Sequence, residues 1–454
     1  MTRSIPLRLA VIIALIPAGI GAQAPLSLRE ALGRAAVSAY SNRVAEADYR
    51  AAGARSALAN QGILPTVRAD VGAIHTNDPL AGFGFLLRQR SATTAAFDPE
   101  GLNNPDPRTD VGSVLTAEVP LINLDAWAAR RGAGHAQRAE GFRRDWSATA
   151  VQLDVLTGYY GAVLARERAD VLRASEMAAQ AHLRRAESVY RNGLVTRSDV
   201  LLAEVRLGEI ETQRIAAEAD EIIARQRLAV ILGTPGDTAF TLPQVIPVAV
   251  MPVVDTAVLG ERADVAMVAA QVDAAEADVR RRTLSLLPRI NGFSRLEWHD
   301  SQTPFTGRSM ATVGIMATWS PFSGGSELAA RKEALAASDA ARAGLEATEA
   351  MAALQLASAQ SAFRVASHAS TIAARSVAQA SEAHRIVQRK YEGGLATVAE
   401  LLDAQATEMS ARLAEAKARH DLVLARGTLA RVQAEDLDPL AAALDAMTIW
   451  KEQE

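Results

Sequence analysis

Two stretches of the sequence, 201 residues apart, are near copies of each other. Residues 190–201 read YRNGLVTRSDVL, and residues 391–402 read YEGGLATVAELL. Each contains a glycine, Gly193 or Gly394, and glycine readily adopts the positive φ with which many helices end. A Thr or Ser follows in each copy and can cap the helix that restarts. The sequence therefore predicts two helical hairpin tips in a chain built from two duplicated halves.

Long segments without proline lead into both tips. Residues 125–190 and 326–391 each comprise 66 residues without a proline. A continuous helix of that length would extend for about 100 Å. After the first tip, a second helical pattern covers residues 198–232, and the second half repeats it. Aromatic residues make up only 4% of the chain, and alanine supplies much of the apolar content. This composition favours long, closely packed helices over a thick globular core.

The hydrophobic period changes from 3.6 to 2 at four places, which predicts two strands in each half. The alternating segments are residues 67–73, 111–119, 290–298 and 311–319. Each strand of about 10 residues has the length of a tilted outer-membrane strand with apolar side chains outside. A soluble antiparallel sheet packed on helices fits the strands equally well. The prolines expected at the entry and exit turns of these strands are Pro65, Pro120, Pro288 and Pro321.

Four strands are too few to close a membrane-spanning barrel, since the known closed barrels start at about 8 strands. An open sheet edge in lipid would leave backbone groups without hydrogen bonds. A barrel would therefore need several copies of the chain, and helices of this length would have to pack between copies as well. The sequence accordingly predicts an obligate oligomer.

The first residues have the pattern of a secretory signal peptide. Arg3 and Arg8 precede a short apolar run, which an Ala-Gln-Ala cleavage pattern follows. The sequence contains no cysteine, and its 48 basic and 52 acidic residues give a net charge of −4, so no basic field for nucleic acid exists. The expected divisions are a signal peptide (1–24), a first repeat (25–242), a linker (243–254), a second repeat (255–438) and a C-terminal tail (439–454).

The chain resembles the TolC family of outer-membrane efflux proteins over nearly its whole mature length. The resemblance rests on the paired tips, on the Leu-Pro pairs that open the strands, and on Pro120 and the Pro-Phe-Ser-Gly-Gly sequence at Pro321 that close them. It implies a mainly α fold with a small β part. Three chains would share one 12-stranded barrel and a periplasmic tunnel of 12 helices. The implied function is a passive, cofactor-free exit channel of a tripartite efflux or type I secretion system.

The resemblance also implies a gate at the tips. Asp199 and Tyr391 would share a hydrogen bond that holds the tip closed. Glu400 and Asp403, three residues apart on one helix face, would face the tunnel, so that three chains bring six carboxylates to a constriction that favours cations. The alternative is that these two carboxylates belong to an ordinary solvated helix face. Opening would be an outward swing of the second hairpin.

The tips themselves would dock a periplasmic adaptor, which is tied to an inner-membrane pump of the resistance-nodulation-division or ABC type. The family has an arginine that bridges neighbouring chains where this chain has Ala396, and Arg191 and Arg197 lie nearby as possible substitutes. The residues expected to contact the adaptor are Gly193, Leu194, Val195, Gly394, Leu395 and Ala396.

An enzyme is not indicated. The seven histidines have no metal-binding spacing, and neither a phosphate-binding glycine loop nor a nucleophile motif is present. We expect no metal and no cofactor. The alternative function is that of a soluble periplasmic coiled-coil adaptor or scaffold, which explains the hairpins but leaves the paired strands unexplained.

Overall fold

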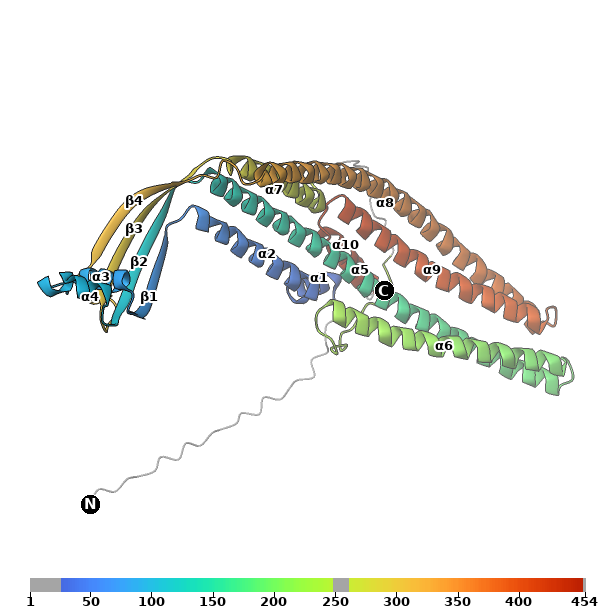
Figure 1. Cartoon of the computed structure of the whole chain (residues 1–454). Coiled ribbons are helices and arrows are strands. Elements are labelled where there is room, and N and C mark those ends of the chain that lie inside the picture. The colour runs from blue at the N-terminus through green and yellow to red at the C-terminus, as the bar shows by residue number, and fades with distance from the viewer. Residues whose placement is uncertain (1–25, 248–260, 452–454) are drawn as a thin grey trace, which may run out of the picture.

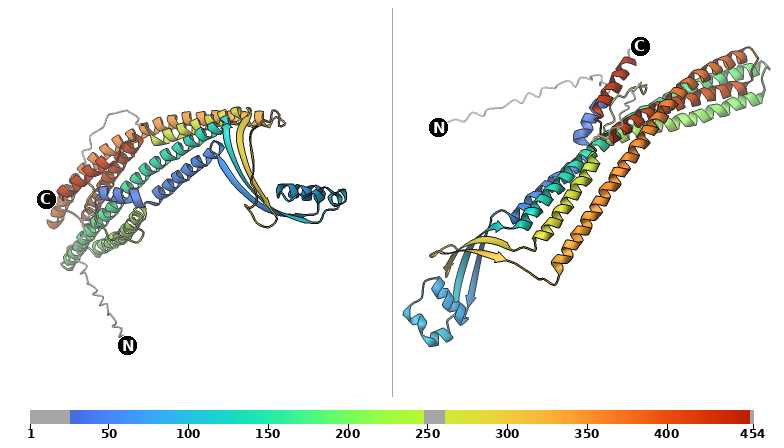
Figure 2. Two further views of the ribbon diagram at one scale, coloured as in Figure 1. Left: turned by 90° about the vertical axis from the view of Figure 1, so that its left-hand side faces the viewer. Right: turned by 90° about the horizontal axis from the view of Figure 1, so that it is seen from above.

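The molecule is long and bent, with a sheet at one end and two helical hairpin tips at the other (Figure 1). The structure, a computed structural model, describes residues 26–247 and 261–451. The expected signal peptide and residues 248–254 of the expected linker lie outside this range. Figure 2 shows that the chain bends where the helices meet the sheet and that the sheet extends away from the helices.

Each half contributes two strands and one long hairpin. The first half contains α1 (Leu28–Ser38), α2 (Tyr40–Leu58), η1 (Ala59–Gly62), β1 (Thr66–Thr76), α3 (Pro79–Arg88), η2 (Thr94–Phe97), α4 (Pro99–Asn103), β2 (Arg108–Ile122), α5 (Leu124–Arg191) and α6 (Arg197–Ile231). The second half contains α7 (Ala263–Leu284), β3 (Arg289–Asp300), β4 (Met310–Thr318), α8 (Ser326–Glu392), α9 (Val398–Val432) and α10 (Asp438–Lys451). The two long helices are unbroken, with 68 residues in α5 and 67 in α8.

The four strands form one antiparallel sheet in the order β1-β2-β3-β4, so that the pairing of β2 with β3 joins the halves. The register places most of the apolar residues of the strands on one face. Leu115 lies opposite both Ala69 and Leu296, and Leu296 lies opposite Ala311. The other face is mixed, with apolar residues such as Phe293 and Met316 among polar ones. There, Thr116 lies between Arg68 and Arg295.

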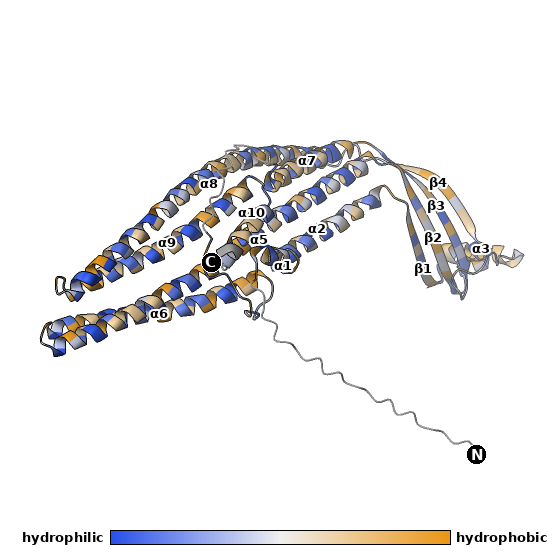
Figure 3. Cartoon of the chain, turned by 180° about the vertical axis from the view of Figure 1, so that it is seen from behind, coloured by the Kyte–Doolittle hydropathy of each residue, from blue (hydrophilic) through white to orange (hydrophobic). Residues whose placement is uncertain are grey.

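The helices form a curved layer, and their order changes along its length. Near the sheet, α5 packs between α2 and α7, and α8 packs on α7. Near the tips, α5 packs between α6 and α9, and α8 packs on α9. Figure 3 shows hydrophobic and hydrophilic bands alternating along these helices. A thin layer of this kind buries only narrow stripes, as expected from a composition rich in alanine and poor in aromatic residues.

A larger core occupies the middle of the molecule, where α1 and α10 cover the centre of α5. Tyr159 and Tyr160 of α5 are almost completely buried there, together with Leu228 of α6 and Leu444 of α10. The Tyr159 hydroxyl donates a hydrogen bond to the carbonyl of Leu26 at 2.6 Å. We call this group the central core.

Residues 240–246 cross the helices beside the central core and are held by arginines. Arg225 donates to the carbonyl of Phe240 at 3.2 Å, and Arg166 donates to that of Leu242 at 3.0 Å. Arg419 of α9 donates to the carbonyl of Ile246 at 3.2 Å. This segment thus ties α9 of the second half to the first half.

The structure differs from the sequence expectation in several local features. The helical pattern of residues 27–61 predicts one helix, but the helix is broken at Ala39, whose ψ of 132° is not helical. The Gly, Pro and Asn content of residues 76–108 predicts a long loop between the first two strands. This stretch contains α3, because Asp78 caps a helix that starts with Pro79 and buries Phe85. The expected C-terminal tail is largely the helix α10, which closes the central core.

The strand prolines divide into two groups. Pro65 and Pro288 directly precede β1 and β3, and Pro321 follows the end of β4. Pro120 lies inside β2, where the expectation of an exit turn is wrong. The register with β3 shifts between Pro120 and Ile122, and a shift of this kind accommodates a residue without an N–H.

Candidate functional site: the hairpin tips

Both hairpin tips have the same local structure. Gly193 and Gly394 have φ values of 74° and 72°, which end α5 and α8 in the left-handed region that glycine favours. Thr196 and Thr397 then cap α6 and α9. The duplicated sequence therefore encodes a duplicated turn.

The carboxylates at the third helical position complete a capping box in each tip. The backbone N–H of Thr196 donates to Asp199 Oδ2 at 2.8 Å, and that of Thr397 donates to Glu400 Oε2 at 2.7 Å. In the second tip, the backbone and hydroxyl donors of Thr397 lower the pKa of Glu400. The carboxylate of Glu400 is thus directed at its own helix end.

Asp403, one turn further along α9, is exposed. Among the described residues, its carboxylate has no hydrogen bond or ion pair, whereas that of Glu400 does. Of the two carboxylates expected at the constriction, Asp403 is therefore the one that is free to face an ion.

The expected hydrogen bond between Asp199 and Tyr391 is absent. Asp199 accepts hydrogen bonds from Thr196 instead. The phenol oxygen of Tyr391 is buried, and it has no hydrogen-bond partner within the described residues. Burial raises the pKa of Tyr391, Arg185 opposes this shift, and the charge of Asp199 adds to it. The two side chains are neighbours, but the capping box takes the carboxylate that the sequence interpretation assigned to the tyrosine.

The two tips meet through an apolar contact that we call the joint. Ala203 of α6 and Val398 and Leu402 of α9 are buried in it. Leu183, Val195 and Tyr391 pack around them. At the far ends of the tips, Leu194 and Leu395 are exposed by 76% and 82%. An exposed leucine at each tip is available to a partner.

Polar contacts between the hairpins lie next to the joint, and we call them the seam. Arg185 of α5 lies 3.6 Å from the carboxylate of Glu392 on α8. Gln405 of α9 donates to the carbonyl of Ser175 on α5 at 3.0 Å. The rings of His182 and His384 pack edge to face, with centroids 5.9 Å apart. The sequence analysis missed the seam because each contact joins residues about 200 positions apart and no spacing pattern marks them.

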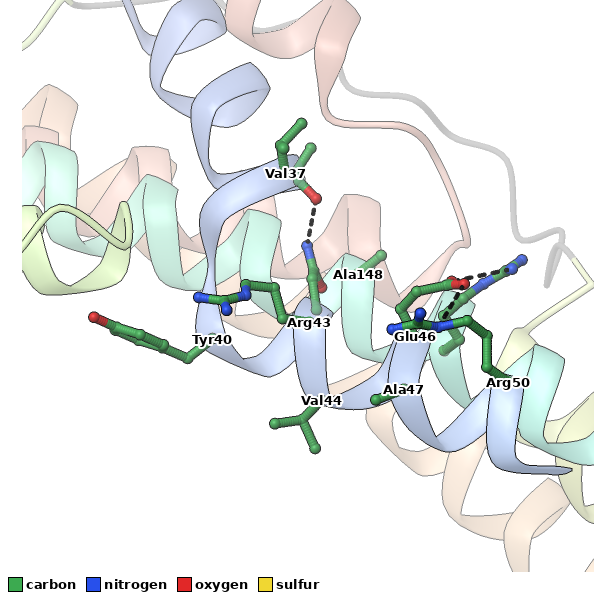
Figure 4. Close-up of a pocket in the computed structure, with 11 residues that line it drawn as sticks. Val37, Tyr40, Arg43, Val44, Glu46, Ala47, Arg50 and Ala148 are labelled. Atoms are coloured by element: carbon green, nitrogen blue, oxygen red, sulfur yellow. Dashed lines mark hydrogen bonds and ion pairs between the residues drawn. The ribbon is translucent and has the colours of Figure 1, made fainter.

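Other surfaces offer no comparable constellation. A pocket of about 810 Å³ lies along the junction of α1 and α2, where Glu46 lies 3.9 Å from Arg50 and 3.7 Å from Arg144 (Figure 4). No cluster of three or more metal-binding side chains occurs within the described residues. Within the same ranges, none of the helices combines the length and the apolar character needed to cross a membrane.

The long paired hairpins, joined to strands with one apolar face, define the class of helical-hairpin channel subunits. Residues 31–234 and 256–434 match the family described as outer membrane efflux protein. Because these residues make up most of the chain, the protein belongs to that family.

Solved structures share the fold. The outer membrane protein VceC of Vibrio cholerae superposes with a TM-score of 0.76 over 90% of this chain and 96% of its own, at 16% identity. The CmeC outer membrane channel of Campylobacter jejuni gives a TM-score of 0.79 over 98% of both chains, at 13% identity. These matches confirm the predicted fold class.

Among characterised relatives, the alkaline protease secretion protein AprF of Pseudomonas aeruginosa is 28% identical over 236 residues. The matched region spans 49% of this chain and 48% of AprF, about half of each. Together with the family, these relatives confirm the outer-membrane localisation with a periplasmic extension. Membership of the family also agrees with the prediction that the chain is not an enzyme, because the family is one of efflux proteins.

Proposed function

We propose that this protein is the outer-membrane exit duct of a tripartite efflux or type I secretion system. The observation that carries the proposal is the register of the sheet, which gives the four strands of the two halves one mainly apolar face. Such a face suits lipid on the outside of a barrel, with the other face lining a lumen. The hairpins then extend the lumen into the periplasm.

The proposed assembly is a homotrimer. Within the described residues, β1 and β4 each pair with only one strand, so both edges of the sheet are open. Pairing of β4 in one copy with β1 in the next would satisfy these edges, and three copies give a closed barrel of 12 strands, in the size range of known barrels. Val37, Tyr40 and Val44 on the edge helices α1 and α2 are exposed, and these side chains point away from the helices (Figure 4). They form an apolar surface that a neighbouring copy would cover.

Aromatic residues support a membrane position for the sheet. Trp298 and Phe305 form an edge-to-face pair, 5.7 Å between centroids, at the end of β3 remote from the helices. Trp319 and Phe322 are 60% and 80% exposed just beyond β4, at the helix end of the sheet. Belts of aromatic residues at both membrane surfaces are typical of membrane proteins.

The proposed partners act at the opposite end. Leu194 and Leu395 would contact a periplasmic adaptor, together with the neighbouring tip residues Gly193, Val195, Gly394 and Ala396. An inner-membrane pump would deliver cargo through that adaptor. Asp403 and Glu400 would line the narrow end of the tunnel. AprF is named for protease secretion and the family for efflux, and both names fit a duct whose cargo is selected by the pump.

The test is the mass of the mature protein in detergent, measured by light scattering corrected for bound detergent, and planar-bilayer conductance on the same sample. A conducting trimer is expected. A soluble monomer or dimer without conductance would refute the duct and favour the periplasmic adaptor or scaffold.

A further inference from the structure

Two histidines from different hairpins meet in the seam. His182 lies on α5 and His384 on α8, and their rings pack edge to face at 69°. The Nε2 atom of each ring is buried, and neither has a hydrogen-bond partner among the described residues. His182 directly precedes Leu183, which packs on the joint. The histidine pair therefore lies where the two hairpins must separate if the tip opens.

One member of the pair is held by a permanent anion. His384 Nδ1 lies 2.6 Å from Glu408 Oε2 on α9, and Ser381 and Arg412 donate to the other oxygen. Burial opposes ionisation of Glu408, but His384, Arg412 and Ser381 outweigh it and lower the pKa of Glu408 to about 2. Glu408 consequently stays charged in any ordinary medium, and His384 is anchored to its own hairpin.

No carboxylate is among the groups that shift the pKa of the other member, His182. Burial lowers the pKa of His182, and the nearby His384 and Arg185 lower it further. Arg185 itself lies beside Glu392 of α8. On α6, the fourth helix at this level, Arg206 and Glu209 pair with each other at 2.6 Å. Among the described residues, His182 has no ion pair, so nothing in the closed seam compensates a charge on its ring.

We propose that His182 and His384 form a proton-operated latch, in which the neutral ring of His182 packs on His384 and holds the two hairpins together, and protonation of His182 drives them apart. The latch rests on the proposed function as a gated duct. In this proposal, the contacts of the seam hold the tip closed. An Asp199–Tyr391 hydrogen bond was expected to do so, nearer the end of the hairpins.

The direction of the pH response follows from linkage. In the closed seam, the pKa of His182 lies below its ordinary value of 6.5. Separation of the hairpins would return the ring to water and the pKa to that value. The open state therefore binds the proton more tightly, and the closed state loses stability as the pH falls through the open-state pKa. Each unit of difference between the two pKa values shifts the ratio of open to closed tips about tenfold at low pH.

Two carboxylates near the tip stay charged in this range. Glu408 and Glu400 both have lowered pKa values and remain ionised under mildly acidic conditions. His420 lies elsewhere on α9, beside Asp421 at 3.2 Å, and does not face the seam. His420 therefore provides a matched control for His182.

The first experiment is planar-bilayer conductance at about pH 7.5 and about pH 5, which bracket the ordinary pKa of imidazole. The unmodified protein should open more often at the lower pH, by about tenfold for each unit by which the pKa of His182 differs between the open and closed tips. His182→Gln, which keeps a neutral polar side chain, should remove this response. His420→Gln should retain it.

A second measurement follows the tips directly. The sequence has no cysteine, so Asn192→Cys and Gly393→Cys provide single labelling sites on the two tips. An added Cβ at Gly393 meets only carbonyl oxygens, at 3.6 Å. The distance between spin labels at these positions should lengthen in acid, and His182→Gln should keep it constant.

The two measurements separate failure of the latch from failure of the duct. Conductance and a label distance that both ignore pH would overturn the latch and leave the duct intact. A full acid response in His182→Gln would also overturn it. The third outcome is a protein that never conducts but whose label distance lengthens in acid only when His182 is present. This result would support the latch and refute the duct.

Discussion

The helices α5 and α8 hold equivalent places in the two halves and have nearly equal lengths, yet their surroundings differ. α5 packs against α1, α2, α6, α7 and α9, and it buries large side chains such as Tyr159 and Tyr160. α8 packs mainly on α7 and α9, and its apolar residues Leu354, Val365 and Ile372 remain exposed within one chain. Duplication preserved the backbone, while side-chain packing made one hairpin an anchor and left the other more loosely held.

This difference identifies the second hairpin as the one able to move. The end of this hairpin near the central core is fixed. There, Arg419 of α9 forms a buried ion pair with Glu167 of α5 and also donates to the carbonyl of Ile246. Within the described residues, the half nearer the tip is held to α5 and α6 by the joint, by the seam and by Met409 of α9, which packs on a small cluster of α5 and α6. A hairpin fixed at one end and weakly held at the other can swing about the fixed end.

Among the variants that test the difference between the two hairpins, Arg419→Ala should have the largest effect on stability. Burial raises the pKa of Glu167, against the effect of the Arg419 charge. Removing the arginine would leave a buried carboxylate without a partner, which costs about 3–5 kcal/mol. Thermal unfolding of the purified assembly, followed by circular dichroism, measures the loss. Lys417→Ala, which removes an exposed pair with Asp421 on the same helix, should change stability by no more than about 0.5 kcal/mol. Equal effects of the two substitutions would mean that α9 is not anchored at Arg419.

Gly427→Ala tests the contact between the hairpins at the central core. A Cβ on Gly427 of α9 would lie 2.1 Å from the side chain of Leu156 on α5, too close for any real contact. The substitution should destabilise the protein by about 1–3 kcal/mol. On α8, a Cβ on Gly344 meets nothing within 4 Å, so Gly344→Ala should stabilise the helix by about 0.5–1 kcal/mol. Denaturant unfolding of both variants gives the comparison, and a stable Gly427→Ala would show that α9 can retreat from α5.

The capping boxes allow the same substitution to be made at equivalent positions of the two tips. Thr196→Ala and Thr397→Ala each remove the side-chain cap of one tip and should each cost about 1 kcal/mol locally. Hydrogen exchange should report similar losses of protection at the starts of α6 and α9. Only Thr397→Ala should raise the opening frequency in bilayers, because only the second hairpin is loosely held. If Thr196→Ala opened the channel as readily, the anchored role of the first hairpin would be wrong.

Sequence reasoning reached the repeated architecture because its signals are local. Proline-free runs, the change of period at Pro65 and Pro288, and the glycine and threonine at each tip depend only on neighbouring residues. The same local logic was available at Asp78-Pro79, where the α3 start was overlooked. The seam could not be predicted in this way, because it depends on how two helices approach each other. The partner of Asp199 was open to the same local reasoning, because an aspartate three residues after a threonine has the spacing of a capping box.

The tips also differ in charge, and the smallest expected effect concerns this difference. The position equivalent to Asp403 in the first tip is Leu202, so the free carboxylate belongs to the second hairpin alone. Since Glu400 is directed into its capping box, Asp403→Asn should reduce the preference for cations more than Glu400→Gln does. The expected change is about two- to threefold for Asp403→Asn, because exposed charges are screened by water and salt. Reversal potentials in a salt gradient measure it, and Leu202→Asp is the matched converse. A larger effect of Glu400→Gln would mean that the carboxylate of Glu400 leaves the capping box in the assembled tip. The two tips would then differ in structure although their sequences are nearly the same.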